Sequence, residues 1–178
     1  MTVGTGILIN AESIDQGMPE ALHVIGEAMA VDRVLVVKNS SDGTLTLPAA
    51  AYRWESPGAA VTFNLSTPEI EALKLNADEM VAWLAPLKTG KPLIAQLKTS
   101  TGSVRSMLEA FHNKSLLMVS INVGGEYWGT LGIDACTTAR EWTASEIYAL
   151  ETLASSIGTL IQRNRTRLLL ESLSLIHI

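Results

Sequence analysis

The chain contains one cysteine, Cys136, and its thiol is the most nucleophilic group that the sequence offers. It lies in the segment EYWGTLGIDACTTAREW, after a strand-like run and before a long helical pattern. A reactive cysteine needs a lowered thiol pKa, which a helix N-terminus, a basic neighbour or a histidine can supply. Arg140 is close in sequence, but no histidine adjoins Cys136, and free cysteines are usually buried. We therefore predict a structural cysteine at a strand end, and an enzyme that uses Cys136 is the alternative that replacement by serine would test.

Histidines and lysine-containing loops are the other groups that could bind a metal or an anion. His112 ends a predicted helix and could ligate a metal or a haem, although a surface position there is more common. No H-x-x-x-H pair or carboxylate cluster supports a metal site. The loop KTSTGS precedes a predicted helix and could present amides to an anion, but it lacks the spacing of a phosphate-binding loop. We expect no metal, no cofactor and no catalytic residue.

The composition limits the classes of protein to which the chain can belong. A chain of 178 residues, 47% hydrophobic and 17% charged, is long enough to bury a core as one domain. The formal net charge of -5 argues against a nucleic-acid-binding face, which needs clustered Lys and Arg. One cysteine excludes an internal disulfide, and no apolar run reaches the length of a membrane span. The start, MTVGTGILIN, lacks the basic region of a signal peptide, so we expect a cytoplasmic domain.

The elements that must position these residues alternate between helix and strand. Apolar residues recur at helical spacing in residues 19–31, 77–88 and 104–111, and again after residue 143. Runs rich in β-branched and aromatic residues predict strands at 33–39, 45–55, 92–98, 115–123 and 126–134. The GGE sequence between the last two runs is a hairpin signal. This order predicts an α+β fold with an antiparallel sheet of about five strands.

A long helix is predicted at the C-terminal end of the chain. Thr143 and Glu146 in TASE form a capping box, which is typical of a helix start. The apolar residues that follow keep the alternating spacing of a coiled-coil seam. The spacing predicts a long helix over residues 143–171 whose coiled-coil seam includes Ile157, Ile161, Asn164 and Leu168.

Several segments, in order, resemble a GAF domain, the small-molecule sensor module of signalling proteins. They are VDRVLVV, YRWESPG, WLAPLKTGKPLI, KSLLMVSINVGGEYWGTLGID and REWTASEIYALETLASSIGTLIQR. The resemblance implies a PAS-related antiparallel sheet of about five to six strands, with terminal helices on one face and short helices over a pocket on the other. It covers residues 13–170, after an N-terminal tail at 1–12. Bilin-binding members of the family carry a cysteine followed by histidine, and ACTTAREW does not.

The pocket that the resemblance implies should be apolar with a few placed polar groups. Strand faces that carry an isolated polar side chain are our candidates for its wall. The family's hairpin often reads V-P-I, and here it is Val119-Ser120-Ile121, which adds a hydroxyl. We predict ligand contacts from Trp54, Gln96, Met118, Ser120 and Thr130.

The resemblance implies a sensory function and no enzymatic activity of the domain itself. The domain would bind an unidentified small molecule, form a homodimer and relay its state through the helix predicted at residues 143–171, which we call the exit helix. Ile157, Ile161, Asn164 and Leu168 would be its dimerisation and signalling residues. The output module, a histidine kinase or a cyclic-dinucleotide enzyme, would belong to the same full-length protein. A ligand-free dimerisation or protein-interaction module, with a pocket filled by its own side chains, is the alternative.

The last residues, LSLIHI at 173–178, match the translation of a common transposon-based sequencing adapter. We expect them to be a sequencing scar, with the native gene continuing beyond about Ser172. Codons there that differ from the adapter would contradict this expectation.

Overall fold

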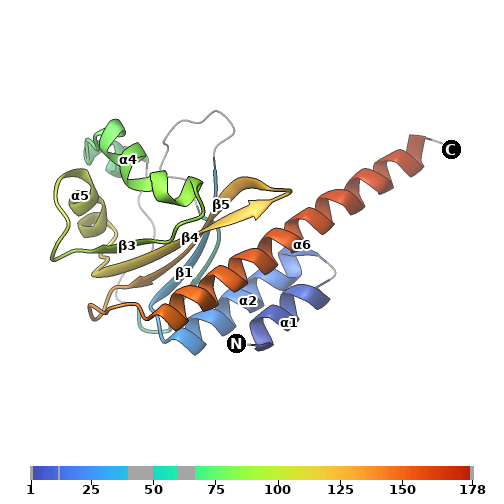
Figure 1. The fold of residues 1–178 in the computed structure, drawn as a ribbon, viewed down its shortest axis with the longest axis horizontal. Helices are drawn as coiled ribbons and strands as arrows, with labels where there is room; N and C mark the ends of the chain where they lie inside the picture. Colours follow the sequence, from blue (N-terminus) through green and yellow to red (C-terminus); the bar gives the residue numbers. More distant parts are fainter. Residues whose placement is uncertain (1, 12, 40–49, 60–66, 177–178) are drawn as a thin grey trace.

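The computed structural model describes residues 2–11, 13–39, 50–59 and 67–176 of the chain. These residues form a five-stranded antiparallel sheet in the order β2-β1-β5-β4-β3, with helices on both faces (Figure 1). The strands are β1 (Arg33–Lys38), β2 (Ala50–Glu55), β3 (Leu93–Gln96), β4 (Ser115–Val123) and β5 (Glu126–Ala135). The helices are α1 (Thr2–Asn10), α2 (Ile14–Met29), α3 (Thr67–Ala72), α4 (Ala77–Lys88), α5 (Gly102–Ala110) and α6 (Ala144–Ile176). The predicted α+β class is confirmed, and residues 45–49 of the predicted second strand lie outside the described residues.

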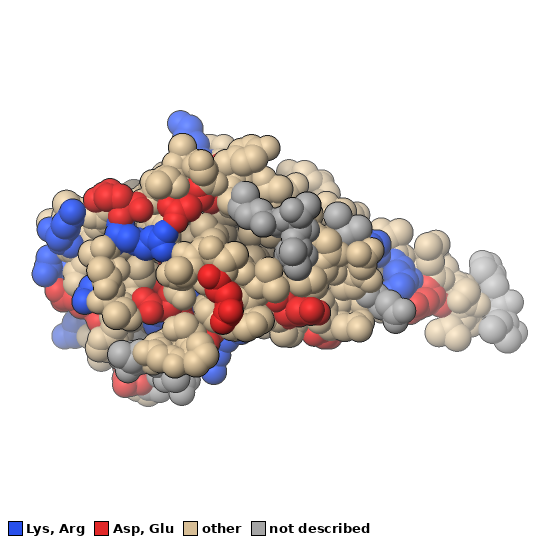
Figure 2. Space-filling view, turned by 90° about the horizontal axis from the view of Figure 1, so that it is seen from below, with Lys and Arg blue, Asp and Glu red and all other residues tan. Residues whose placement is uncertain are grey.

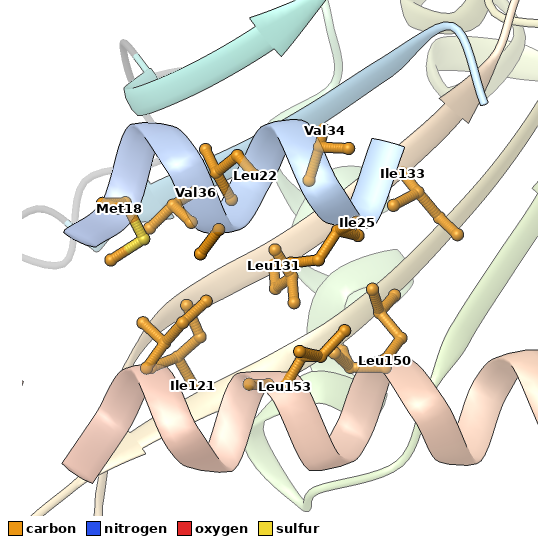
Figure 3. Close-up of a cluster of buried hydrophobic side chains, with 14 of the residues drawn as sticks. Met18, Leu22, Ile25, Val34, Val36, Ile121, Leu131, Ile133, Leu150 and Leu153 are labelled. Atoms are coloured by element: carbon orange, nitrogen blue, oxygen red, sulfur yellow. The ribbon is translucent and has the colours of Figure 1, made fainter. Parts of the chain in front are cut away.

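The terminal helices α1, α2 and α6 cover one face of the sheet, which we call the helix face (Figure 1). Met18, Leu22 and Ile25 lie about one turn apart on α2, so they share the side of the helix that meets the sheet. Figure 3 shows Leu131 of the sheet between these side chains of α2 and Leu150 and Leu153 of α6. The main hydrophobic core therefore lies between the sheet and the terminal helices.

The short helices α4 and α5 lie on the opposite face, which we call the ligand face (Figure 1). Met80 of α4 and Leu108 of α5 are buried in a second, smaller apolar cluster with Leu116 of β4. Strand β4 thus supplies side chains to both clusters, because successive residues of a strand point to opposite faces.

The N-termini of α4 and α5 cap each other. Asn76 caps α4, since its Oδ1 accepts a hydrogen bond from the Glu79 amide at 2.9 Å. The Asn76 amide in turn donates to Ser103 Oγ at 2.8 Å, and both carboxylate oxygens of Glu79 accept from the Ser103 amide at 3.1 Å. A carboxylate is favoured there because a helix N-terminus carries partial positive charge. The helix start in KTSTGS therefore receives its anion from Glu79 of the same chain.

Helix α6 begins at the predicted capping box, which is confirmed. The Thr143 amide donates to Glu146 Oε2 at 2.8 Å, and the Glu146 amide donates to Thr143 Oγ1 at 3.2 Å. Buried side chains continue along α6 as far as Ile161. Beyond that residue the helix projects from the body (Figures 1 and 2). None of the helices in the described part of the chain is long and apolar enough to cross a membrane.

Residues 2–10, which we predicted to belong to an N-terminal tail, form helix α1. This helix packs against α2 and α6, and Leu8 is buried between them. Arg163 Nη2 of α6 donates to the Ala11 carbonyl oxygen at 2.6 Å, just after α1 ends. The first and last helices of the chain are therefore in direct contact.

Candidate functional site

Three of the predicted ligand residues lie together on the ligand face. Met118 is opposite Gly132, and Ser120 is opposite Thr130, across the β4–β5 ladder. The alternate residues of β4 belong to the main core on the helix face, so Met118 and Ser120 point away from it. The structure therefore brings Met118, Ser120 and Thr130 into one patch.

Hydroxyl groups give this patch its polar character. Tyr127 Oη and Thr130 Oγ1 are 2.8 Å apart, within hydrogen-bond distance. Burial raises the pKa of Tyr127, although the bond with Thr130 works to lower it, so the phenol stays protonated at neutral pH. Ser120 is half-buried, and among the described residues its hydroxyl has no hydrogen-bond partner. The patch thus holds one satisfied pair of hydroxyls and one hydroxyl that is open to a ligand or to water.

Strand β1 extends the patch with apolar side chains. Leu35 is opposite Gly132, and Val37 is opposite Thr130, in the β1–β5 ladder. Leu35 is buried and Val37 is half-buried. An apolar surface with a few convergent polar groups is the usual composition of a small-molecule site.

A buried ion pair lies at the other end of the ligand face. Arg33 Nε donates to Asp134 Oδ2 at 3.0 Å, and neither residue is exposed. Arg33 Nη2 also donates to the Phe111 carbonyl oxygen at 2.7 Å and to Asn113 Oδ1, just after α5. Burial raises the pKa of Asp134 to about 6, while the charge of Arg33 works to lower it. Arg33 therefore ties the C-terminal end of α5 to the sheet, where a positive charge also suits the helix dipole.

Our sequence analysis missed this pair. Its signal was a charged residue next to a run of apolar residues in each of two strands, Arg33 in β1 and Asp134 in β5. Charged residues are rarely buried without a partner, so two such residues would have been candidates for pairing.

The structure separates Trp54 and Gln96 from the other predicted ligand residues. Trp54 lies on the helix face, where its ring packs against Gly26 of α2 and lies 5.8 Å from the ring of His23. Gln96 lies at the outer edge of the sheet and shares a hydrogen bond with Glu141. Alternation along one strand shows which residues share a face, but it does not show which face of the sheet that is.

Gln96 helps to line an open groove of about 600 Å³ over the edge of β3. Trp83 and Ile94 supply apolar surface, and Lys98 and Glu141 form an ion pair across it at 3.5 Å. Their side chains are 65% and 80% exposed, so the pair contributes little. This groove lies away from the hydroxyl patch and offers a ligand no buried polar group.

Cys136 lies directly after β5 in a polar, partly buried setting. Its Sγ is 3.5 Å from Asn113 Oδ1, and its amide donates to Asp32 Oδ2 at 2.6 Å. Burial raises the pKa of the thiol to about 11, since the lowering effect of Arg33 is outweighed by burial and nearby carboxylates. The thiolate that nucleophilic chemistry requires is therefore disfavoured at neutral pH, which supports the structural role.

Neither of the two histidines that the structure describes, His23 and His112, belongs to a group of side chains that could hold a metal ion. His112 is exposed, with a left-handed backbone (φ 56°) at the turn after α5. Within the described residues, no three His, Cys, Asp or Glu side chains are grouped so that they could hold a metal ion.

The four predicted seam residues of α6 divide into two pairs. Ile157 and Ile161 are 0% and 4% exposed in the main core, so the domain itself uses them. Asn164 is half-buried and accepts a hydrogen bond from Arg167 Nη2 at 3.0 Å, and Leu168 is 53% exposed. The same spacing suits a core face and a dimer seam, so sequence periodicity could not place the boundary between them.

Comparison with known proteins identifies the fold described above. The sequence model of the GAF domain matches residues 13–161, most of the chain. The chain belongs to the GAF domain family. The family that the sequence segments resembled is thus confirmed.

This GAF domain is similar to parts of much longer proteins. It is 30% identical over 161 residues to the methanogenesis regulatory histidine kinase FilI of Methanothrix harundinacea, covering 90% of this chain and 18% of the kinase. It is 23% identical over 150 residues to an uncharacterised protein of Azorhizobium caulinodans, covering 83% of this chain and 20% of that protein. The chain therefore spans about a fifth of the length of these relatives.

Solved structures similar to this GAF domain include bilin-bound proteins. The structure of a protein in its far-red-absorbing dark state, with bound biliverdin, has a TM-score of 0.72 at 14% identity. The match covers 92% of this chain and 98% of that one. The phycocyanobilin-bound GAF domain of a cyanobacterial phytochrome has a TM-score of 0.71 at 15% identity, covering 93% of each chain. At these identities the likeness shows the fold alone.

Proposed function

We propose that this GAF domain is a sensor that binds a small molecule on the ligand face. Met118, Ser120 and Thr130 form the centre of the site, and the short helices α4 and α5 flank it. Helix α6 passes the state of the site to an output module of the full-length protein. The similarity to a regulatory histidine kinase supports a kinase as that output.

The hydroxyl of Ser120 is the observation that carries the proposal. It is half-buried on a face that Leu35, Val37 and Met118 make largely apolar, and no described residue bonds to it. Withdrawing a hydroxyl from water without a partner costs free energy. A ligand with a hydrogen-bonding group and an apolar body would satisfy the hydroxyl and cover the apolar surface at once.

Signal transfer in this proposal is a population shift. A ligand that binds one arrangement of the helices better than another changes their relative populations by its difference in affinity. The projecting part of α6 would form the dimer seam through Asn164 and Leu168. Leu169 and Leu170, which are 63% and 62% exposed, add apolar surface that a partner helix would cover.

Native mass spectrometry of the chain, purified without added ligand, tests the proposal. A reproducible mass excess would reveal a bound molecule, and its loss in Ser120→Ala, but not in the surface control Ser155→Ala, would place it on the ligand face. A bare mass, unchanged by cell extract, would contradict ligand binding and favour the dimerisation module.

A covalent bilin is a specific case that the structural neighbours raise. We expect no covalent adduct, because Cys136 is the single cysteine and burial raises the pKa of its thiol to about 11. Incubation with biliverdin or phycocyanobilin, followed by denaturation and mass spectrometry, measures this directly. An adduct that disappears in Cys136→Ser would contradict the expectation.

A further inference from the structure

We infer that the β4–β5 hairpin is the mechanical link between the ligand face and α6, and that the Tyr127–Thr130 hydroxyl pair sets its position. The inference rests on the proposed function, because it assigns the regulation of that same site.

The first step is a close contact between α6 and the end of the hairpin. Gly158 of α6 is buried, and a Cβ there would collide with the carbonyl oxygen of Asn122 at the end of β4. The helix backbone therefore rests on the strand backbone, which only glycine permits. At the hairpin turn, a Cβ on Gly124 would lie 3.4 Å from Oε1 of Gln162, one helical turn further along α6. The end of the hairpin thus touches α6 over residues 158–162.

The second step is the place of this contact on the helix. Buried residues of α6 end at Ile161, so the contact involves the last turn that the body of the domain holds. Figure 1 shows the hairpin end beside α6 at the point where the helix leaves the sheet. A shift of the hairpin end therefore acts on α6 where a small rotation moves the whole projecting segment.

The third step connects the hairpin end to the ligand face. Asn122 is opposite Tyr127, and the ladder register is irregular between Ile121 and Asn122. The Tyr127 hydroxyl reaches back across this irregular part to Thr130, which is opposite Ser120. Irregular pairing disrupts a ladder locally, so this hydroxyl pair contributes to holding the hairpin end. A ligand group that takes over the hydrogen bond of Thr130 releases Tyr127 and allows the hairpin end to shift against Gly158.

Amide hydrogen exchange of the ligand-free chain tests the link with a matched pair of variants. Thr130→Val removes the hydroxyl with little change of shape, and Thr130→Ser keeps it. We expect Thr130→Val to speed exchange at residues 158–162 about fivefold, the effect of one lost hydrogen bond, and Thr130→Ser to leave it near the original rate. Amides of α2 and α5 are the internal reference, because a general loss of stability would speed their exchange as well.

A second pair of variants removes the hydroxyl of the other partner, Tyr127, and that of a control tyrosine, Tyr52. Tyr127→Phe should reproduce the effect of Thr130→Val. Tyr52→Phe removes a different phenol bond, to Asp15 Oδ1 at 2.7 Å, and should leave residues 158–162 unchanged. Unchanged exchange in both Thr130→Val and Tyr127→Phe, equal acceleration in α2, α5 and α6, or failure of both variants to fold would overturn the inference. Because no ligand enters this experiment, its failure is separate from a failure of the sensor proposal.

Discussion

The two faces of the sheet are built in different ways. On the helix face, buried side chains such as Val34, Ile133 and Leu150 are apolar and form a single continuous core. On the ligand face, the same strands bury Arg33, Asp134 and other polar groups beside a smaller apolar cluster. Apolar burial is non-directional and depends on area, whereas a buried polar group needs a particular partner.

This difference separates the parts of the molecule that specify the fold from those that specify a site. A substitution on the helix face should cost free energy in proportion to the volume removed. A substitution on the ligand face should cost free energy according to the partner that it leaves unmatched.

Removal of the buried carboxylate should have the largest effect. Asp134→Ala leaves Arg33 buried without its counter-ion, and we expect the free energy of unfolding to fall by about 3–5 kcal/mol. Urea denaturation followed by tryptophan fluorescence measures it. Glu109→Ala is the control, because it removes the exposed Arg105–Glu109 pair and should cost less than about 1 kcal/mol. If both variants lost the same free energy of unfolding, the expected difference between a buried and an exposed ion pair would be contradicted.

A cavity on the helix face should come next. Leu150 is fully buried between α6 and the sheet, and Leu150→Ala should lower the free energy of unfolding by about 3 kcal/mol. Met118→Ala on the ligand face should cost clearly less, because Met118 is only half-buried. Denaturation curves give the free energy of unfolding of both variants. If Met118→Ala lowered it as much as Leu150→Ala does, the expected difference between the two faces would be contradicted.

Asp32 lies directly before β1, where it accepts hydrogen bonds from the residues after β5, and its removal should give a smaller, pH-dependent effect. Burial works to raise the pKa of Asp32, but hydrogen bonds from Thr137 and the Cys136 amide outweigh it and lower the pKa. The unfolded state therefore binds the proton more readily, so this contribution to stability is present above about pH 4 and is lost as the pH falls further.

Asp32→Asn should lower the free energy of unfolding by about 1–2 kcal/mol at pH 7 and should flatten its fall below about pH 4. Denaturation at several pH values measures both quantities. A variant with the original acid dependence would show that Asp32 is not its source.

Ser120→Ala should have the smallest effect on stability and the largest on ligand binding. Its hydroxyl has no partner among the described residues, so the free energy of unfolding should change by less than about 0.5 kcal/mol. Occupancy by a co-purified or titrated ligand should fall about tenfold, as expected for the loss of one ligand hydrogen bond. A large loss of stability with unchanged occupancy would mean that Ser120 serves the fold.

Much of the helix face was predictable because its signals are local. The apolar spacing of α2, the capping box of α6 and the β4–β5 hairpin each depend on residues that are close in sequence. Helix α1 was missed although its segment GILI is apolar, because nothing in so short a run shows that α2 and α6 will cover it.

The ligand face was predictable only in part. Alternation correctly grouped Met118 with Ser120, since they belong to one strand. It could not show that Trp54 and Gln96 lie apart from them, because whether residues of different strands share a face depends on the register between the strands.

The sequence by itself determined the family and, apart from α1 and α3, the order of the described elements and their approximate boundaries. These properties follow from propensity, periodicity and capping, which act over one or two turns of chain. Only the tertiary structure decided that Arg33 meets Asp134 across 101 positions, that Ile157 and Ile161 belong to the core, and that Gly158 rests on Asn122. These contacts depend on strand register and helix packing, which many distant residues settle together, so no local pattern contains them.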